Sequence, residues 1–193
     1  SVTLEFWMTL RQRKVWSKLF CLGKDTSDGI AFTFNRTNDT GVYSLDVNGE
    51  GGGTFGMDAM RFETAPYYIA ITFTPDGNGG TYARTYCRNL SSDKMVYMVN
   101  HTFVNWSVLT RITQNVFWLG HSFWSDYDAY IDIDEVRVWN GTLSEDLLIR
   151  SAANGPDASA DQIASIEDAT YSQLYVASGA RVDLGGKKLI QSG

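Results

Sequence analysis

Residues 130–151, YIDIDEVRVWNGTLSEDLLIRS, constrain the fold more than any other stretch, because they combine a strand pattern with a turn and a helix start. In the first half, apolar side chains alternate with polar ones, as in a β-strand with one buried face. The apolar positions change face midway, from Ile131 and Ile133 to Val136 and Val138. This change indicates either a strand that is covered on both faces or one that contains a β-bulge.

The second half of this stretch predicts one short capped helix. An Asn-Gly dipeptide after the strand favours a turn. Thr142, with Glu145 three residues later, has the spacing of a capping box, so Thr142 is the predicted N-cap. Gly155, which is followed by proline, predicts the end of the helix.

The chain before this stretch consists of short strand patterns separated by turn-forming residues. Strands are predicted at residues 2–10, 16–22, 30–34, 43–47, 67–73, 81–89, 95–99 and 116–119. Five of the nine residues in 48–56 are glycine, so this segment is not expected to form a regular strand interior. So many short strands favour an all-β fold, an antiparallel two-sheet sandwich.

Period-two spacing in three separate strands predicts one sandwich core. The predicted core residues are Val2, Leu4, Phe6, Ile69, Ile71, Phe73, Val136 and Val138. Trp7 lies on the opposite face of its strand and is a candidate ligand contact. That face is either a concave groove that binds glycans or a second buried layer.

Five segments carry a family resemblance: VTLEFWM, WSKLFCLGKD, APYYIAITFTPDG, VFWLGHS and IDEVRVWNGTLSEDLL. In this order they resemble strands of the laminin-G-like jelly roll, a fold of the concanavalin A-like lectin and glucanase superfamily. The resemblance implies a jelly-roll domain over residues 1–155. It also implies an extracellular or cell-surface location and a binding function, since most members of this family are binding modules.

Asp134 is a candidate calcium ligand. It is in phase with Val136 and Val138, and a carboxylate on a core face is costly unless it is paired or bound to metal. Carboxylate oxygens suit Ca2+, and the resemblance implies a structural calcium held by an aspartate of the closing strand, as in related glucanases. The alternative is that Asp134 lies at the sheet rim and accepts hydrogen bonds from backbone amides or water.

Residues 120–129 are predicted to form a loop rich in aromatic and acidic side chains. Trp124 and Tyr127 offer faces on which a sugar ring can stack, and Asp126 and Asp128 can accept hydrogen bonds from sugar hydroxyls. These four are candidate ligand-binding residues. The alternative for Trp124 is that its ring folds back over the edge of the core.

The composition argues against several classes of protein. A net charge of −6 without a basic cluster excludes a nucleic-acid partner, and no apolar run reaches membrane-spanning length. Glycosidases need two catalytic carboxyl groups, but the Glu-x-Asp-x-x-Glu pattern of the related glucanases is absent. Glu135 and Arg137 share a strand face and are expected to form a surface ion pair of little functional weight.

Cysteines and sequons leave alternatives open. Cys21 and Cys87 either form one disulfide or remain two buried thiols. The Asn-x-Ser/Thr sequons would be glycan sites in a secreted eukaryotic protein, but polar β surfaces also produce such triplets by chance. They begin at Asn35, Asn38, Asn89, Asn100, Asn105 and Asn140.

The sequence therefore predicts a non-catalytic extracellular module that binds a glycan or a protein through its rim loops. The alternatives are a structural or adhesive spacer of a large cell-surface protein with no small ligand and, less favoured, a glycan hydrolase. Residues 156–193 predict a linker and a β-hairpin tail. One tail strand is expected to dock along the sandwich edge, in its own chain or by strand exchange with a neighbour, unless the tail begins a separate β domain.

Overall fold

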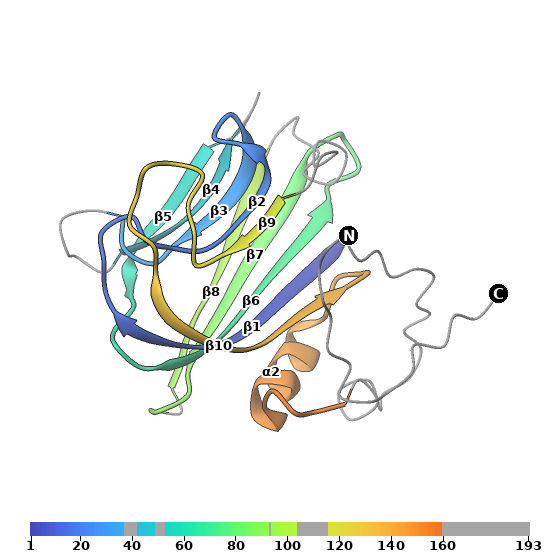
Figure 1. The fold of residues 1–193 in the computed structure, drawn as a ribbon. Helices are drawn as coiled ribbons and strands as arrows, with labels where there is room; N and C mark the ends of the chain where they lie inside the picture. Colours follow the sequence, from blue (N-terminus) through green and yellow to red (C-terminus); the bar gives the residue numbers. More distant parts are fainter. Residues whose placement is uncertain (37–41, 49–52, 93, 104–115, 160–193) are drawn as a thin grey trace.

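The computed structural model describes residues 1–36, 42–48, 53–92, 94–103 and 116–159. Within them the chain forms two antiparallel five-stranded sheets that face each other, with one helix against one of the sheets (Figure 1). The elements are β1 (Val2–Gln12), β2 (Lys18–Asp25), β3 (Asp28–Thr33), β4 (Val42–Asn48), β5 (Gly53–Arg61), β6 (Pro66–Pro75), β7 (Thr81–Asn89), β8 (Lys94–Phe103), β9 (Val116–Leu119), β10 (Tyr130–Trp139) and α2 (Glu145–Asn154). This is the predicted jelly-roll sandwich.

The first and last strands lie side by side in one sheet. Sheet A has the order β10-β1-β6-β7-β8, and sheet B has the order β5-β4-β3-β2-β9. β1 pairs with β6 on one side and with β10 on the other, so segments far apart in sequence meet in sheet A. β10 therefore closes sheet A at the edge next to β1.

The predicted core is confirmed. Leu4, Phe6, Ile69, Ile71 and Phe73 are buried between the sheets, and the three predicted valines are partly buried against the same cluster. Sheet B contributes aromatic as well as aliphatic side chains, and the rings of Phe20 and Phe32 lie 6.4 Å apart. Alternation along each strand thus produces the core that its period-two pattern predicts.

A β-bulge in β10 explains why the apolar residues change face. Trp7 on β1 is opposite Glu135, but the next residue, Met8, is opposite Ile133, so Asp134 is the extra residue of the bulge. The bulge resets the alternation, and the isoleucines before it and the valines after it all pack against the same core. The bulge alternative of the sequence is therefore correct.

The N-cap of the helix lies two residues later than predicted. Ser144, not Thr142, is the N-cap, and its side chain accepts a hydrogen bond from Leu147 N–H at 3.4 Å. Thr142 instead forms a hydrogen bond with the hydroxyl of Thr74 at 2.7 Å, which ties the turn to β6. The predicted helix end is confirmed, because Gly155 has φ 81° and donates its N–H to Ser151 C=O.

Trp7 belongs to a second buried layer, so the interpretation as a ligand contact is wrong. It is 2% exposed and packs with Tyr68 and Leu148 between the outer face of sheet A and α2. The Arg137 guanidinium lies 4.4 Å from the Trp7 ring centroid, and Arg137 donates to Glu135 at 2.7 Å. The predicted pair between Glu135 and Arg137 thus forms, but it is partly buried and helps to cover the tryptophan.

The structure also tests the predictions for the glycine-rich segment, the two cysteines and one sequon. β5 begins at Gly53, so the glycine-rich segment 48–56 is partly a strand, because an edge strand needs backbone pairing more than side-chain packing. Cys21 and Cys87 are free and buried, which confirms the two-thiol alternative. Asn35 is fully buried, which leaves its sequon no room for a glycan. The tail hairpin and its docking lie outside the described residues.

Candidate ligand-binding site

The loop 120–129 lies across the outer face of sheet B, the face that points away from the core (Figure 1). Gly120 N–H donates to Leu19 C=O at 2.8 Å and joins the start of the loop to β2. Phe123 packs over Gly29 so closely that a Cβ atom at Gly29 would lie 2.9 Å from its ring. The loop is therefore a packed part of the surface and has a defined position relative to the sheet.

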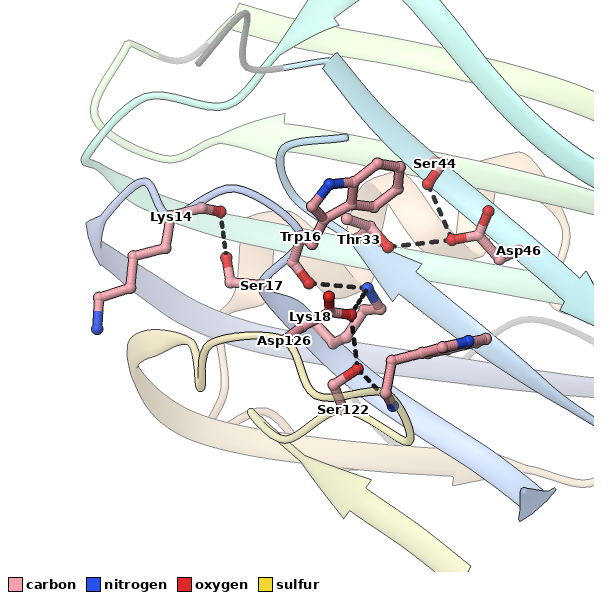
Figure 2. Close-up of polar contacts among 10 residues, drawn as sticks. Lys14, Trp16, Ser17, Lys18, Thr33, Ser44, Asp46, Ser122 and Asp126 are labelled. Carbon is pink, nitrogen blue, oxygen red and sulfur yellow. Dashed lines mark hydrogen bonds and ion pairs between the residues drawn. The ribbon is translucent and has the colours of Figure 1, made fainter. Parts of the chain in front are cut away.

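Lys18 is the polar centre under this loop. Its side chain is 2% exposed, and its ammonium donates to Asp126 Oδ2 at 2.9 Å and to Trp16 C=O at 2.7 Å (Figure 2). The same ammonium lies 5.5 Å from the ring centroid of Trp16 and 5.2 Å from that of Trp124. One buried cation thus binds the β1–β2 turn, the loop and two indole rings together.

Asp126, predicted as a ligand contact, has a structural role through Oδ2. That oxygen also accepts a hydrogen bond from Ser122 Oγ at 2.9 Å, and Trp124 N–H donates to Ser122 Oγ at 3.1 Å. Trp124 is half-buried and packs against Lys18, so the alternative that its ring covers the edge of the core is not what the structure shows. Its contact is with Lys18 on the outer face and not with the core between the sheets.

Trp16 is a site residue that sequence reasoning missed. The pattern placed it inside a strand, but it precedes β2 in the left-handed backbone region, with φ 63°, and it is 39% exposed. A non-glycine residue in this region is uncommon and depends on its surroundings to hold it. Trp16 N–H donates to Asn35 C=O at 2.7 Å, and Lys18 binds its carbonyl. The preceding run of charged residues marks a turn, but it does not reveal the conformation of the tryptophan.

The exposed rim of the loop carries the other candidates. Tyr127 is 70% exposed, and the Lys14 ammonium lies 5.8 Å from its ring centroid. Asp128 is exposed and forms a hydrogen bond of 2.5 Å with His121 Nδ1, and the His121 ring lies 4.7 Å from that of Trp118. Aromatic faces and hydrogen-bonding groups therefore alternate along this edge.

A row of polar side chains continues from Lys18 across the outer face of sheet B. Thr33 on β3 is opposite Lys18 on one side and opposite Ser44 of β4 on the other. Both hydroxyls donate to Asp46 Oδ2, Thr33 at 3.1 Å and Ser44 at 3.0 Å (Figure 2). Cys21 lies under this surface, and burial raises the pKa of its thiol to about 11. A Phe123 backbone hydrogen bond and the charges of the row have smaller effects on this pKa.

Residues 1–147 match the family described as the concanavalin A-like lectin/glucanases superfamily, of the laminin G type. The chain belongs to this superfamily.

Two solved structures resemble this concanavalin A-like domain at low identity. An uncharacterized protein from Mycobacterium paratuberculosis is 16% identical, with a TM-score of 0.45, and the match covers 72% of this chain and 69% of that one. An ancestral congerin is 12% identical, with a TM-score of 0.40, and the match covers 72% of this chain and 90% of that one. No curated protein matches the chain. Within the described residues, no helix has the length and apolarity needed to cross a membrane.

Asp134 does not fit the calcium site expected of a concanavalin A-like closing strand. The bulge places it in an exposed position, and it borders a hollow of about 340 Å3 on the outer face of sheet A, which Trp7 and Pro156 also line. Its neighbour Asp132 pairs with Arg11. No group of three or more His, Cys, Asp or Glu side chains suited to a metal occurs in the described part of the chain. The premise of a carboxylate on the core face is therefore wrong.

Proposed function

We propose that this domain is a non-catalytic recognition module that acts outside the cell and binds a glycan at the outer face of sheet B. The ligand contacts come from loop 120–129, led by Tyr127 and Trp124, together with Trp16 from the β1–β2 turn. Asp128 at the rim supplies a hydrogen-bond acceptor. Membership of a lectin and glucanase superfamily supports a lectin-like function.

The observation that carries this proposal is the immobilised aromatic surface around Lys18. Two indole rings contact one ammonium that is itself bonded to Asp126 and to a backbone carbonyl. Rings held in this way lose little side-chain entropy when a ligand binds, and preorganisation of this kind favours affinity. Trp16 and Tyr127 each keep an accessible surface, so a pyranose ring can stack on them.

A glycan array with the purified domain, followed by titration calorimetry of the best ligand, tests the proposal. Trp16→Ala and Tyr127→Ala should each weaken binding by about fivefold or more, since stacking on an aromatic ring contributes about 1–3 kcal/mol in comparable contacts. Tyr82→Ala is the matched control, because Tyr82 is an exposed aromatic residue on β7 of the other sheet. Trp124→Ala should weaken binding with a nearly unchanged melting temperature, and a large drop would assign Trp124 a purely structural role.

The alternatives give different results. If the wild-type domain binds no glycan, the spacer function remains. If the domain captures a protein ligand and Tyr127→Ala does not weaken that binding, the recognition surface lies elsewhere. Release of reducing ends from β-glucans would show a hydrolase. The proposal expects none, because the DIDE carboxylates lie on the far sheet and Glu135 is paired with Arg137.

A further inference from the structure

We infer that this site takes an uncharged saccharide, and that Asp46 accepts a hydrogen bond from one of its hydroxyls. The inference rests on the proposed function and names the class of ligand. It also adds a residue that neither the sequence pattern nor the family match singles out.

Asp46 is a preoriented hydrogen-bond acceptor. The residue is 8% exposed, and Thr33 and Ser44 both donate to the same carboxylate oxygen, Oδ2. Two donors on one oxygen fix the orientation of the carboxylate before a ligand binds. A carboxylate only accepts hydrogen bonds, and the hydroxyl groups of a saccharide can donate them.

Asp46 belongs to the same surface as the aromatic residues. Thr33, which bonds to Asp46, lies opposite Lys18 in the β2–β3 register, and Lys18 lies under the Trp16 ring. Figure 2 shows Trp16, Lys18, Thr33 and Asp46 together on one side of the sheet. A ring stacked on Trp16 therefore has an acceptor within the same surface.

The charges around this surface disfavour an acidic ligand. The Lys18 ammonium is almost fully buried and already bonded to Asp126, so it is not accessible to a ligand anion. Asp46 and the exposed Asp128 add negative charge to this surface, and Lys14 lies beside Tyr127. Carboxylate or sulfate groups on a glycan would meet like charge here, in a chain whose net charge is −6.

The test compares two glycan panels on the full chain. The neutral panel contains cello-, laminari-, manno- and galacto-oligosaccharides, and the acidic panel contains heparin fragments, sialylated glycans and oligogalacturonates. We expect binding to neutral members only, with an affinity that stays within a factor of two between about 0.01 M and 1 M salt. Asp46→Asn should weaken that binding by about tenfold or more, because a charged acceptor is lost. Asp157→Asn, which removes an exposed carboxylate elsewhere, should leave it unchanged.

Each outcome decides one point. Binding to the acidic panel, with an affinity that falls steeply as salt rises, overturns the inference and leaves the proposed function standing. Equal affinity of Asp46→Asn and wild type for the neutral ligand overturns the role of Asp46. If Asp46→Asn does not fold, the salt series on the wild type still decides the charge of the ligand. If the wild type binds neither panel, both the inference and the proposed function fail.

Discussion

At the scale of single residues, Lys18 determines whether the loop 120–129 can hold its place on the sheet. A buried ammonium is costly unless its charge is paired and its N–H groups are bonded, and Asp126 with the Trp16 carbonyl provides both. The aromatic and acidic residues of the loop are recognisable from composition, and the sequence does predict them. Lys18 is not recognisable, because a lysine on a strand ordinarily faces water.

Lys18→Met should lower the free energy of unfolding by roughly 3 kcal/mol, because it leaves the Asp126 carboxylate under the loop without its cation. Lys24→Met, a change at an exposed lysine on the same strand, should alter it by less than about 0.5 kcal/mol. Urea denaturation of both variants makes the comparison.

The double variant Lys18→Met/Asp126→Asn gives the control for this pair. It should cost less than the sum of the two single changes, because removing both partners leaves no unpaired charge. Additive effects in this cycle would show that the two side chains do not stabilise each other.

At the scale of elements, the closing strand β10 shows what a sequence pattern can and cannot specify. The shift of apolar residues from one face to the other predicted either a bulge or a strand covered on both sides, and the structure contains the bulge. The choice could not be made from the sequence, because it depends on β1, which lies more than a hundred residues earlier and sets the register. For the same reason, the sequence pattern wrongly placed Asp134 on the core face of the strand.

Neighbouring substitutions in β10 test the bulge. Ile133→Ala should destabilise the domain by about 2–3 kcal/mol, because Ile133 packs against the core from a partly buried position. Asp134→Ala should change the free energy of unfolding by less than about 0.5 kcal/mol, because Asp134 is exposed. The melting temperature of wild type should be the same in EDTA as in excess calcium, and so should that of Asp134→Ala. A calcium-dependent rise that Asp134→Ala abolishes would restore the metal site.

The start of α2 gives a second test at this scale. Ser144→Ala should cost about 1 kcal/mol, because it removes the acceptor for Leu147 N–H at the N-terminus of the helix. Thr142→Ala removes only the exposed bond to Thr74 and should cost clearly less. Chemical denaturation of the two variants distinguishes them, and the reverse order would assign the cap to Thr142, as its capping-box spacing predicted.

At the scale of the whole molecule, the two outer faces of the sandwich differ in what covers them. α2 covers part of sheet A and buries Trp7, Tyr68 and Tyr86 in a second layer, whereas the loop 120–129 covers part of sheet B. Period-two alternation predicts the core between the sheets but describes an outer face only as polar or aromatic. It therefore left Trp7 undecided between a binding groove and a buried layer, and only the packed helix decides it.

The buried tyrosines of this molecule should make it unstable in alkali. Burial raises the pKa of Tyr67, Tyr68 and Tyr86 above the usual value of 10.0, and for Tyr68 the Glu5 carboxylate adds to this effect. The unfolded chain therefore releases these protons at lower pH than the folded chain does. Above pH 10 the unfolded state binds fewer protons, so the free energy of unfolding must fall as pH rises.

Tyr86→Phe isolates one part of this effect. The Tyr86 hydroxyl is buried and, among the described residues, has no hydrogen-bond partner, so its removal should leave the melting temperature at pH 7 unchanged or slightly higher. Between pH 9 and pH 11 the melting temperature of wild type should fall more steeply than that of Tyr86→Phe, because the variant lacks one raised pKa. Tyr82→Phe, a change at an exposed tyrosine on the same strand β7, should follow the wild-type profile. Parallel profiles for wild type and Tyr86→Phe would mean that Tyr86 ionises equally in the folded and unfolded chains, and that α2 does not seal the second layer from water.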